Sequence, residues 1–323
     1  MISLHPDDWA EVIGQDLADF IGAGGAMVRF VVGDTVPDLA HARRSLKMLA
    51  EESKLHFFDV NGSHTRLHFP NEILAAVAEQ IDFRLLMTSF LLEAVIAEGY
   101  EVPPGTENFV LHDVANLNDI LPKQVHEVIN ARIKSGIMRD RRLNRDLRYA
   151  LWAIAREVLR GVPPDSIGNI PKRWLTGQVT IKELRAYGIV QKANRYNARG
   201  LLRSLLTWLP ASEWNGSIVL INGLRLALSH NPHDGKLFYT RSALTDVYEV
   251  MREFIDETDD MSHVLLVFAM PGEFLSIDPK GRGMGAYQAL QFRVSNFSDT
   301  ELPNPLSNMV LLGTGAERRS FSA

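Results

Sequence analysis

The first third of the chain alternates between short apolar runs and longer amphipathic segments. Val28–Val32 and Leu55–Val60 are mainly apolar segments of strand length, and segments with helical spacing of apolar residues follow them, over His41–Glu52 and Asn71–Glu98. Asp8–Phe20 has the same helical spacing ahead of the first run. Strands that alternate with helices pair in parallel, because each helix returns the chain to the start of the next strand. The pattern therefore predicts an α/β core.

The same pattern returns near the end of the chain. Ser217–Ile221 and His263–Ala269 are apolar runs typical of buried strands, and the amphipathic segment Thr240–Asp256 between them predicts a helix. Met309–Leu312 is long enough for a short last strand. We expect these strands to complete the sheet that the first third of the chain begins.

Between residues 116 and 209 nearly every segment has helical periodicity instead. Leu121-Pro122-Lys123 predicts the start of a helix that runs to Ile133, and Ser135-Gly136 predicts a tight turn after it. Together with the basic run that follows, this loosely resembles a helix-turn-helix. We expect residues 1–115 and 210–323 to form the α/β core and residues 116–209 to form a helical insertion.

The charges of the chain are segregated. Residues 123–203 contain 18 Lys and Arg against 6 Asp and Glu, whereas the rest of the chain contains 16 against 33. A basic surface of this kind suits a polyanion or an acidic partner, although a solvated helical surface explains it equally well. The candidate contacts with DNA or an acidic partner are Arg139, Arg141, Arg142, Arg145, Arg148, Lys172, Arg173, Lys192, Arg195 and Arg199.

Part of this basic set is expected to share one helix face. Arg141, Arg145 and Arg148 are separated by four and three residues, which places them on the same side of a helix. Trp174 and Tyr196 stand beside basic residues, where they could stack on bases or pack in a core. Such contacts favour double-stranded DNA as a partner through its phosphates and indicate no preferred base sequence.

Composition limits the expected cellular location of the protein and the kinds of metal site that it can form. The chain has no cysteine, which excludes disulfides and thiolate metal sites. It has no apolar run of membrane-spanning length, and Met1–Asp8 lacks the features of a signal peptide, so we expect a cytoplasmic protein. His64 and His68 have a metal-ligand spacing only on a helix, but the segment predicts a turn at Asn61-Gly62-Ser63 and a strand at Leu67–Phe69. His230 and His233 lie in a polar loop, and no metal is expected at either pair.

The junction after the first strand has the outline of a phosphate-binding loop without its residues. A P-loop needs several glycines, a Lys for the β- and γ-phosphates and a Ser or Thr for Mg²⁺. In Gly33-Asp34-Thr35-Val36-Pro37-Asp38 there is one glycine and no Lys, Thr35 is misplaced, and Pro37 has no amide donor. The two carboxylates would repel a triphosphate. The sequence therefore predicts an emptied nucleotide site.

A second loss agrees with the first. P-loop ATPases hold Mg²⁺ and activate water with acidic residues near the end of another apolar strand. Ile218–Ile221 is such a strand, but Asn222 and Gly223 follow it. An asparagine brings no charge to a metal or a water, and a glycine brings no side chain. Two losses at complementary positions indicate that hydrolysis has been abandoned.

Several ordered stretches carry a family resemblance. They are Val31–Asp34, Leu184–Ile189 with Asn197–Arg203, Val264–Phe274 and Gly281–Arg293. They resemble, in turn, the strand into the phosphate loop, the approach to the acidic strand, the sensor strand and the glycine–tyrosine–leucine–arginine segment of one family. That family is the ATP-binding proteins of bacterial BREX phage-defence systems, a BrxC/BrxD-like P-loop group related to AAA+ ATPases. The chain resembles a degenerate member of it.

The resemblance implies a P-loop/AAA+-like parallel sheet flanked by helices. The family's helical lid would begin near Leu312, but the chain stops at Ala323, so no C-terminal lid is expected. Arg293 matches the family's arginine. It is expected either to act as a finger on a neighbouring subunit's ATP or to form a salt bridge at the sheet edge.

With the lost residues, the resemblance implies a catalytically inactive pseudo-ATPase subunit of an antiphage defence system. No catalytic residue and no cofactor is expected. The expected partners are an active ATPase, helicase or nuclease of the same system and possible double-stranded DNA, in a hetero- or homo-oligomer. The alternatives are a DNA-binding module that acts through the helical insertion and a residual ATP-binding protein. An enzyme with chemistry relocated to the His and Asp loops ranks last.

Overall fold

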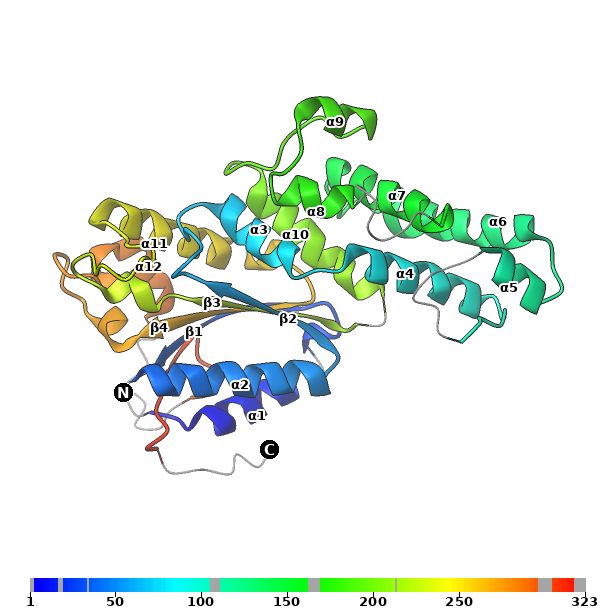
Figure 1. Cartoon of the computed structure of the whole chain (residues 1–323). Coiled ribbons are helices and arrows are strands. Elements are labelled where there is room, and N and C mark those ends of the chain that lie inside the picture. The colour runs from blue at the N-terminus through cyan, green and yellow to red at the C-terminus, as the bar shows by residue number, and fades with distance from the viewer. Residues whose placement is uncertain are drawn as a thin grey trace. The chain divides into compact units, whose positions relative to one another are not determined.

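The chain divides into two compact units (Figure 1). Met1–Val77 with Asn215–Ala323 forms one, called the sheet unit below, and Ala78–Trp214 forms the other, called the helical unit. The computed structural model describes residues 3–16, 20–33, 35–104, 111–161, 169–212, 214–295 and 304–316.

The sheet unit is built on five parallel strands in the order β2-β3-β4-β1-β5. The strands are β1 (Ala26–Gly33), β2 (Leu55–Asn61), β3 (Gly216–Asn222), β4 (Val264–Pro271) and β5 (Met309–Leu312). The five runs predicted as the main strands all form strands, and β5 has the predicted bounds, but Leu67–Phe69, also predicted as a strand, lies in a turn instead. β3 and β4 are buried along almost their whole length, as parallel strands with helices on both faces must be. The predicted α/β class with a parallel sheet is confirmed.

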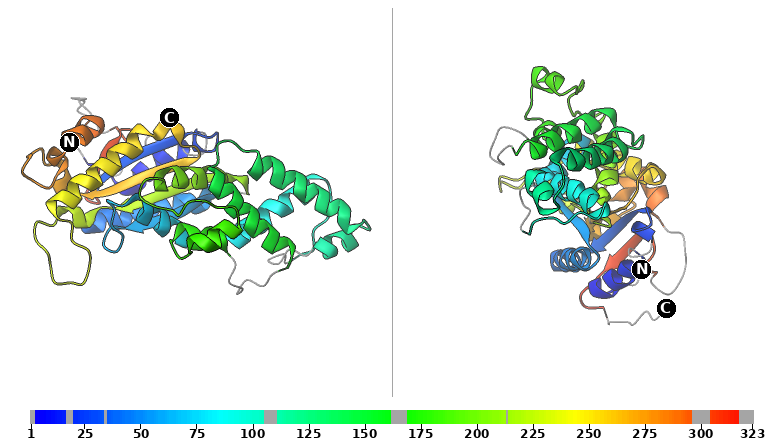
Figure 2. Two further views of the ribbon diagram at one scale, coloured as in Figure 1. Left: turned by 90° about the horizontal axis from the view of Figure 1, so that it is seen from above. Right: turned by 90° about the vertical axis from the view of Figure 1, so that its right-hand side faces the viewer.

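Helices cover both faces of this sheet (Figure 2). The α-helices of the sheet unit are α1 (Pro6–Asp16), α2 (Val36–Glu52), most of α3 (Pro70–Glu79), α11 (Arg241–Asp256) and α12 (Gln288–Val294). On the face covered by α1 and α2, Trp9, Leu46 and Val267 belong to one core cluster. On the other face, Phe254 of α11 contacts Phe268 of β4, with 6.3 Å between ring centroids. Val267 and Phe268 enter different cores because successive strand residues point to opposite faces.

The helical unit begins earlier than the sequence analysis places the insertion. The last residues of α3 lead into it, and its α-helices are α4 (Phe83–Ala97), α5 (Leu111–Leu117), α6 (Pro122–Ile133), α7 (Arg145–Leu159), α8 (Ile170–Leu175), α9 (Ile181–Ala186) and α10 (Ala198–Trp208). α4 contacts both α6 and α7, and its Phe90 and Leu91 are fully buried. The unit therefore includes α4 and starts at Ala78, not at residue 116. Charge and periodicity did not reveal which core α4 joins.

The predicted tight turn at Ser135-Gly136 does not form. The chain continues from α6 into a π-helical turn, η2 (Lys134–Met138). Gly136 packs closely against Phe90. A larger residue would not fit there without a shift of the phenyl ring, since a Cβ at position 136 would lie 2.9 Å from it. The break between helices comes later, between η2 and α7, so the helix-turn-helix pattern read from the sequence is wrong in its placement.

Short 3-10 helices connect several of these elements. They are η3 (Leu209–Ala211), η4 (Leu224–Ala227), η5 (Thr258–Asp260), η6 (Gly272–Leu275) and η7 (Met284–Ala286). Within the ranges that the structure describes, no helix combines the length and the apolar character needed to span a membrane.

Candidate functional site

The order of the strands marks one edge of the sheet as the place for a ligand. The connection after β1 runs through α2 to β2 on one side, whereas the connection after β4 passes β1 to reach β5 on the other. In parallel sheets, ligands bind at the carboxyl ends of strands where connections diverge in this way. Gly33 at the end of β1 pairs with Pro271 at the end of β4. The emptied nucleotide site of the sequence analysis lies at this edge.

The residues after β1 form the start of a helix. α2 begins at Val36, ahead of the predicted start at His41, and Thr35 is its N-cap. The backbone N–H of Thr35 donates to Oδ2 of Asp38 at 2.8 Å, and the N–H of Asp38 donates to Oγ1 of Thr35 at 3.4 Å, which together make a capping box. Pro37 lies in the first helical turn, where a missing amide donor is tolerated. Thr35 and Pro37 therefore have structural roles.

The second carboxylate oxygen of Asp38 holds the segment that follows β5. Oδ1 accepts from the backbone N–H and from the hydroxyl of Thr314, both at 2.8 Å. Only 2% of Asp38 is exposed. Burial raises the pKa of this carboxyl, but the hydrogen bonds from Thr35 and Thr314 outweigh it and leave the pKa below its ordinary 3.8. A charged carboxylate thus lies at the positive end of α2, a position that favours anions such as phosphate.

Close packing explains why position 33 is a glycine. A Cβ on Gly33 would lie 2.6 Å from Cγ of Leu39 and 3.1 Å from the backbone oxygen of Thr35. Leu39 is buried in the core beneath α2. The group that approaches Gly33 closely is therefore the protein's own side chain. Asp34, which the sequence analysis assigns to the same degenerate site, lies outside the described residues.

Asn222 and Gly223 have structural roles at the end of β3. Oδ1 of Asn222 accepts from the N–H of Leu224 at 3.0 Å, and the N–H of Gly223 donates to the backbone oxygen of Ala269 at 2.8 Å. A Cβ on Gly223 would lie 2.5 Å from Sδ of Met270. The asparagine thus stabilises its own turn, and the glycine allows β4 to pack closely.

The described part of this edge offers little to a nucleotide. Gly33, Thr35, Asn222 and Gly223 bring no cationic side chain, and the carboxylate of Asp38 is already hydrogen-bonded through both oxygens. Among the residues with described positions, no three His, Asp or Glu side chains gather as metal ligands.

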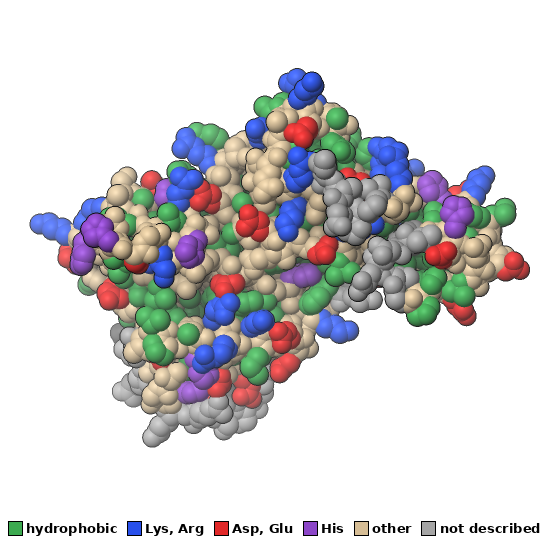
Figure 3. Space-filling view, viewed as in Figure 1, with side chains coloured by type: hydrophobic (Ala, Val, Ile, Leu, Met, Phe, Trp, Pro, Cys, Tyr) green, Lys and Arg blue, Asp and Glu red, His purple; other side chains and the backbone are tan. Residues whose placement is uncertain are grey.

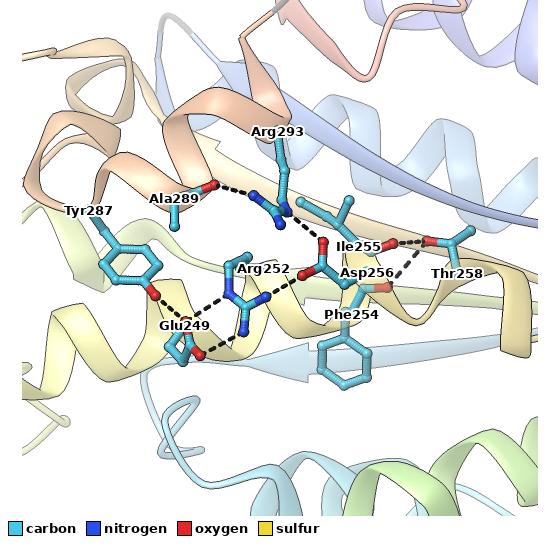
Figure 4. A network of polar contacts seen from close by, with 9 residues as sticks. All are labelled: Glu249, Arg252, Phe254, Ile255, Asp256, Thr258, Tyr287, Ala289 and Arg293. Carbon is cyan, nitrogen blue, oxygen red and sulfur yellow. Dashed lines mark hydrogen bonds and ion pairs between the residues drawn. The ribbon is translucent and has the colours of Figure 1, made fainter.

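Arg293 takes part in an ion-pair network between α11 and α12 (Figure 4). Its Nε donates to Oδ1 of Asp256 at 2.5 Å, and its Nη1 donates to the backbone oxygen of Ala289 at 3.3 Å. Asp256 also pairs with Arg252, whose guanidinium binds Glu249. Arg293 therefore forms a salt bridge within its own subunit, and 40% of its side chain remains exposed.

Arg293 lies at the amino edge of β1. It lines a cavity of about 340 Å³ together with Arg29 and Thr258, and the same cavity is lined by Ala26–Phe30, the first part of β1. Gly33 is the last residue of that strand. Arg293 therefore lies at the other end of β1 from the nucleotide site that the sequence predicts, and a role toward another subunit stays a prediction.

Arg139, Arg141 and Arg142 lie in the turn between η2 and α7, called the basic turn below, and not on a helix face. Arg141 precedes α7, which begins at Arg145, so Arg141, Arg145 and Arg148 do not share one helix as predicted. The helix starts there because the side chain of Asn144 caps it, accepting from the N–H of Asp146 at 2.8 Å.

Most of the predicted basic contacts already have partners within the chain. Arg142 pairs with Asp140, Arg173 with Glu183, and Arg145 with Asp146; Arg148 donates to the backbone oxygen of Met138 and Lys172 to that of Glu79. Arg139, Arg141 and Lys192 are exposed and form no ion pair with any described residue. These three side chains are the best placed to meet an external anion.

Asp146 joins the basic turn to the loop that precedes α10. Its Oδ2 accepts from the N–H groups of Val190 and Gln191 at 3.1 and 3.0 Å, and its Oδ1 binds Arg145 at 3.1 Å. Asp146 is 6% exposed. The loop that carries Lys192 is therefore held against the start of α7, which brings separate basic segments of the sequence together.

The two aromatic residues named with the basic set have different roles. Trp174 is 1% exposed and donates from Nε1 to the backbone oxygen of Gln191 at 2.9 Å, so it is a core residue. Tyr196 is 81% exposed, beside Arg195. Arg199 lies in the first turn of α10 and is partly buried. In Figure 3, Lys and Arg side chains gather at α9 and over the neighbouring part of the helical unit.

Sequence reasoning missed Asp38 as a structural carboxylate and Asp146 as the organiser of the basic surface. A local signal existed for Asp38, since Thr35-x-x-Asp38 resembles a capping box ahead of an apolar run. No local signal exists for Asp146, because its partners Val190 and Gln191 are distant in sequence.

Comparisons of this chain with protein-family models, with curated proteins and with solved structures find no match. Its function therefore has to be inferred from the residues and their geometry.

Proposed function

We propose that this protein is a non-hydrolysing, AAA+-like scaffold subunit of a bacterial antiphage defence system, acting in the cytoplasm. The observation that carries the proposal is the carboxylate of Asp38 at the start of α2. It fixes a negative charge close to where a P-loop fold would bind the phosphates of ATP. A parallel sheet with β1 between β4 and β5 is compatible with such a fold.

Loss of the phosphate contacts leaves the rest of the unit able to fold, because the core depends on packing and not on the ligand. Gly33 and Gly223, which resemble remnants of a nucleotide site, are both required by neighbouring side chains, Leu39 and Met270. A subunit of this kind acts through its surfaces. Its partner would be an active ATPase, helicase or nuclease of the same system.

The proposal is tested in the host and in the purified complex. Deleting the gene should remove protection against phage, and restoring it should recover protection. The chain purified alone should hydrolyse no ATP, while the complex with products of neighbouring genes should do so. ATP hydrolysis by the chain alone, or full protection without it, would count against the scaffold role.

DNA binding through the helical unit is a second candidate function. It is favoured by the exposed cations Arg139, Arg141 and Lys192, which face solvent without a described acidic partner. The sequence also contains no Asp or Glu between Glu183 and Glu213. A surface with this charge binds phosphates with an affinity that falls as salt rises.

A further inference from the structure

Tyr196 is exposed to an unusual degree. Of its surface, 81% is accessible, the largest fraction among the exposed large apolar side chains in the described residues. The guanidinium carbon of Arg195 lies 4.6 Å from the ring centroid, and Arg195 donates to the hydroxyl. Such exposure leaves part of the ring open to a ligand. Burial in the core does not explain an aromatic residue at this position.

The backbone around Tyr196 is fixed by two asparagine side chains. Oδ1 of Asn194 accepts from the N–H of Tyr196 at 2.8 Å, and Oδ1 of Asn197 accepts from the N–H of Asn194 at 2.8 Å. Nδ2 of Asn197 donates to the backbone oxygen of Lys192 at 3.0 Å. These bonds satisfy polar groups of the loop internally, so Tyr196 projects from an ordered backbone.

The base of the same loop is anchored to buried residues. Asp146 accepts from the N–H groups of Val190 and Gln191, and Trp174 donates to the backbone oxygen of Gln191. Both anchoring side chains are more than nine-tenths buried. A loop held at its base and along its length loses little conformational entropy when it binds, which is the condition for a preformed site.

The charged side chains of the sequence stretch that contains this loop are all positive. The stretch between Glu183 and Glu213 contains no acidic residue and carries the cations Arg185, Lys192, Arg195, Arg199 and Arg203. An exposed ring between cations combines the two features used to bind single strands, a stacking surface for a base and positive charge for phosphates. A duplex offers its phosphates but keeps its bases stacked on one another.

We propose that the loop from Val190 to Asn197 binds single-stranded DNA, with Tyr196 stacking on one unpaired base. Lys192 and Arg195 contact the phosphates on either side of that base. The inference rests on the second candidate function, DNA binding by the helical unit, and assigns it a strand type and a stacking residue.

The test compares the binding of fluorescent oligonucleotides to the full chain and its variants. The probes are a single-stranded DNA, the same sequence as RNA, and the corresponding duplex. Tyr196→Ala should weaken single-strand binding about ten-fold, or about 1.4 kcal/mol, because it removes the ring on which the base stacks. It should leave duplex binding and the melting temperature unchanged. Tyr196→Phe keeps the ring and should retain the affinity.

Phe292→Ala is the matched control, since Phe292 is a 65% exposed aromatic residue of the sheet unit. It should bind single strands like the wild type. If Tyr196→Ala also does so while Lys192→Glu loses binding, the surface is purely electrostatic. That result would contradict the stacking role of Tyr196, while DNA binding by the helical unit would still be supported. If the wild type binds none of the three probes, both the stacking site and DNA binding by the helical unit are overturned. Tighter binding of RNA than of DNA, or of duplex than of single strand, overturns the assignment to single-stranded DNA.

Discussion

The carboxylate of Asp38 accepts two hydrogen bonds from Thr314, one from the backbone N–H and one from the hydroxyl, both at 2.8 Å. The two residues stand 276 positions apart in the sequence. Asp38 lies in the first turn of α2 and Thr314 follows β5, so the contact joins the segments beyond β1 and its neighbouring edge strand. The same carboxylate closes the capping box with Thr35.

Removing this carboxylate should destabilise the sheet unit. Asp38→Ala leaves the donors of Thr35 and Thr314 without their acceptor, and we expect a loss of about 2–3 kcal/mol in the free energy of unfolding. Urea denaturation measures it. Glu51→Ala removes the same charge from the last turn of α2, where the side chain is 68% exposed and 4.0 Å from Lys47. That control should be indistinguishable from the wild type.

The contribution of Asp38 should depend on pH in a defined direction. Its pKa in the folded protein lies below 3.8, because hydrogen bonds outweigh burial. The stabilisation is therefore complete above the unfolded pKa and is lost as the pH falls through the folded pKa. The gap in unfolding free energy between the wild type and Asp38→Ala should narrow below about pH 4. A gap that widens on acidification would mean that the folded pKa is raised.

The strands were the most predictable part of this fold. Ile218–Ile221 and Val264–Ala269 are continuous apolar runs, and such runs are typical of strands buried on both faces. The start of α2 was predicted too late, because Thr35 and Pro37 were interpreted as parts of a turn. Both are ordinary residues for a helix start.

The contacts that define the candidate sites were beyond sequence reasoning. Asp38 meets Thr314, and Asp146 meets Val190, only because the tertiary fold brings distant segments together. The membership of α4 in the helical unit likewise depends on which apolar faces pack, and its own sequence is apolar around much of the helix. Trp174 and Tyr196 both stand beside basic residues in the sequence, but Trp174 is buried in the fold and Tyr196 is exposed.

Gly33 distinguishes a packing role from a phosphate-binding role. Gly33→Ala should lower the unfolding free energy by about 1–3 kcal/mol, because its Cβ would lie 2.6 Å from Leu39. In the double variant with Leu39→Ala, the cost of the two changes should be less than additive. Gly200→Ala is the control: nothing lies within 4 Å of its Cβ, and an alanine inside α10 should stabilise the protein by up to about 1 kcal/mol. Strict additivity of Gly33→Ala and Leu39→Ala would remove the packing explanation.

The exposed arginines of the basic turn should set the salt dependence of duplex binding. Arg139→Ala with Arg141→Ala should weaken binding and reduce the slope of log affinity against log salt by about 2, since each phosphate contact contributes about 0.9. Titrations at several salt concentrations measure this slope. Arg66→Ala removes one positive charge from the sheet unit, where Arg66 pairs with Glu72, and should leave the slope unchanged. If Arg66→Ala reduced the slope equally, the net charge of the protein, and not the position of these arginines, would determine the salt dependence of duplex binding.

The most direct test of the emptied nucleotide site is the melting temperature of the full chain with increasing Mg·ATP, against a control matched for ionic strength. A nucleotide that binds the folded state at 100 times its Kd stabilises it by about 2.7 kcal/mol, which is readily measured. With the carboxylate of Asp38 at the start of α2, we expect no shift up to millimolar ATP. A saturable rise in melting temperature with ATP, absent from the salt control, would contradict the proposal that this site no longer binds nucleotide.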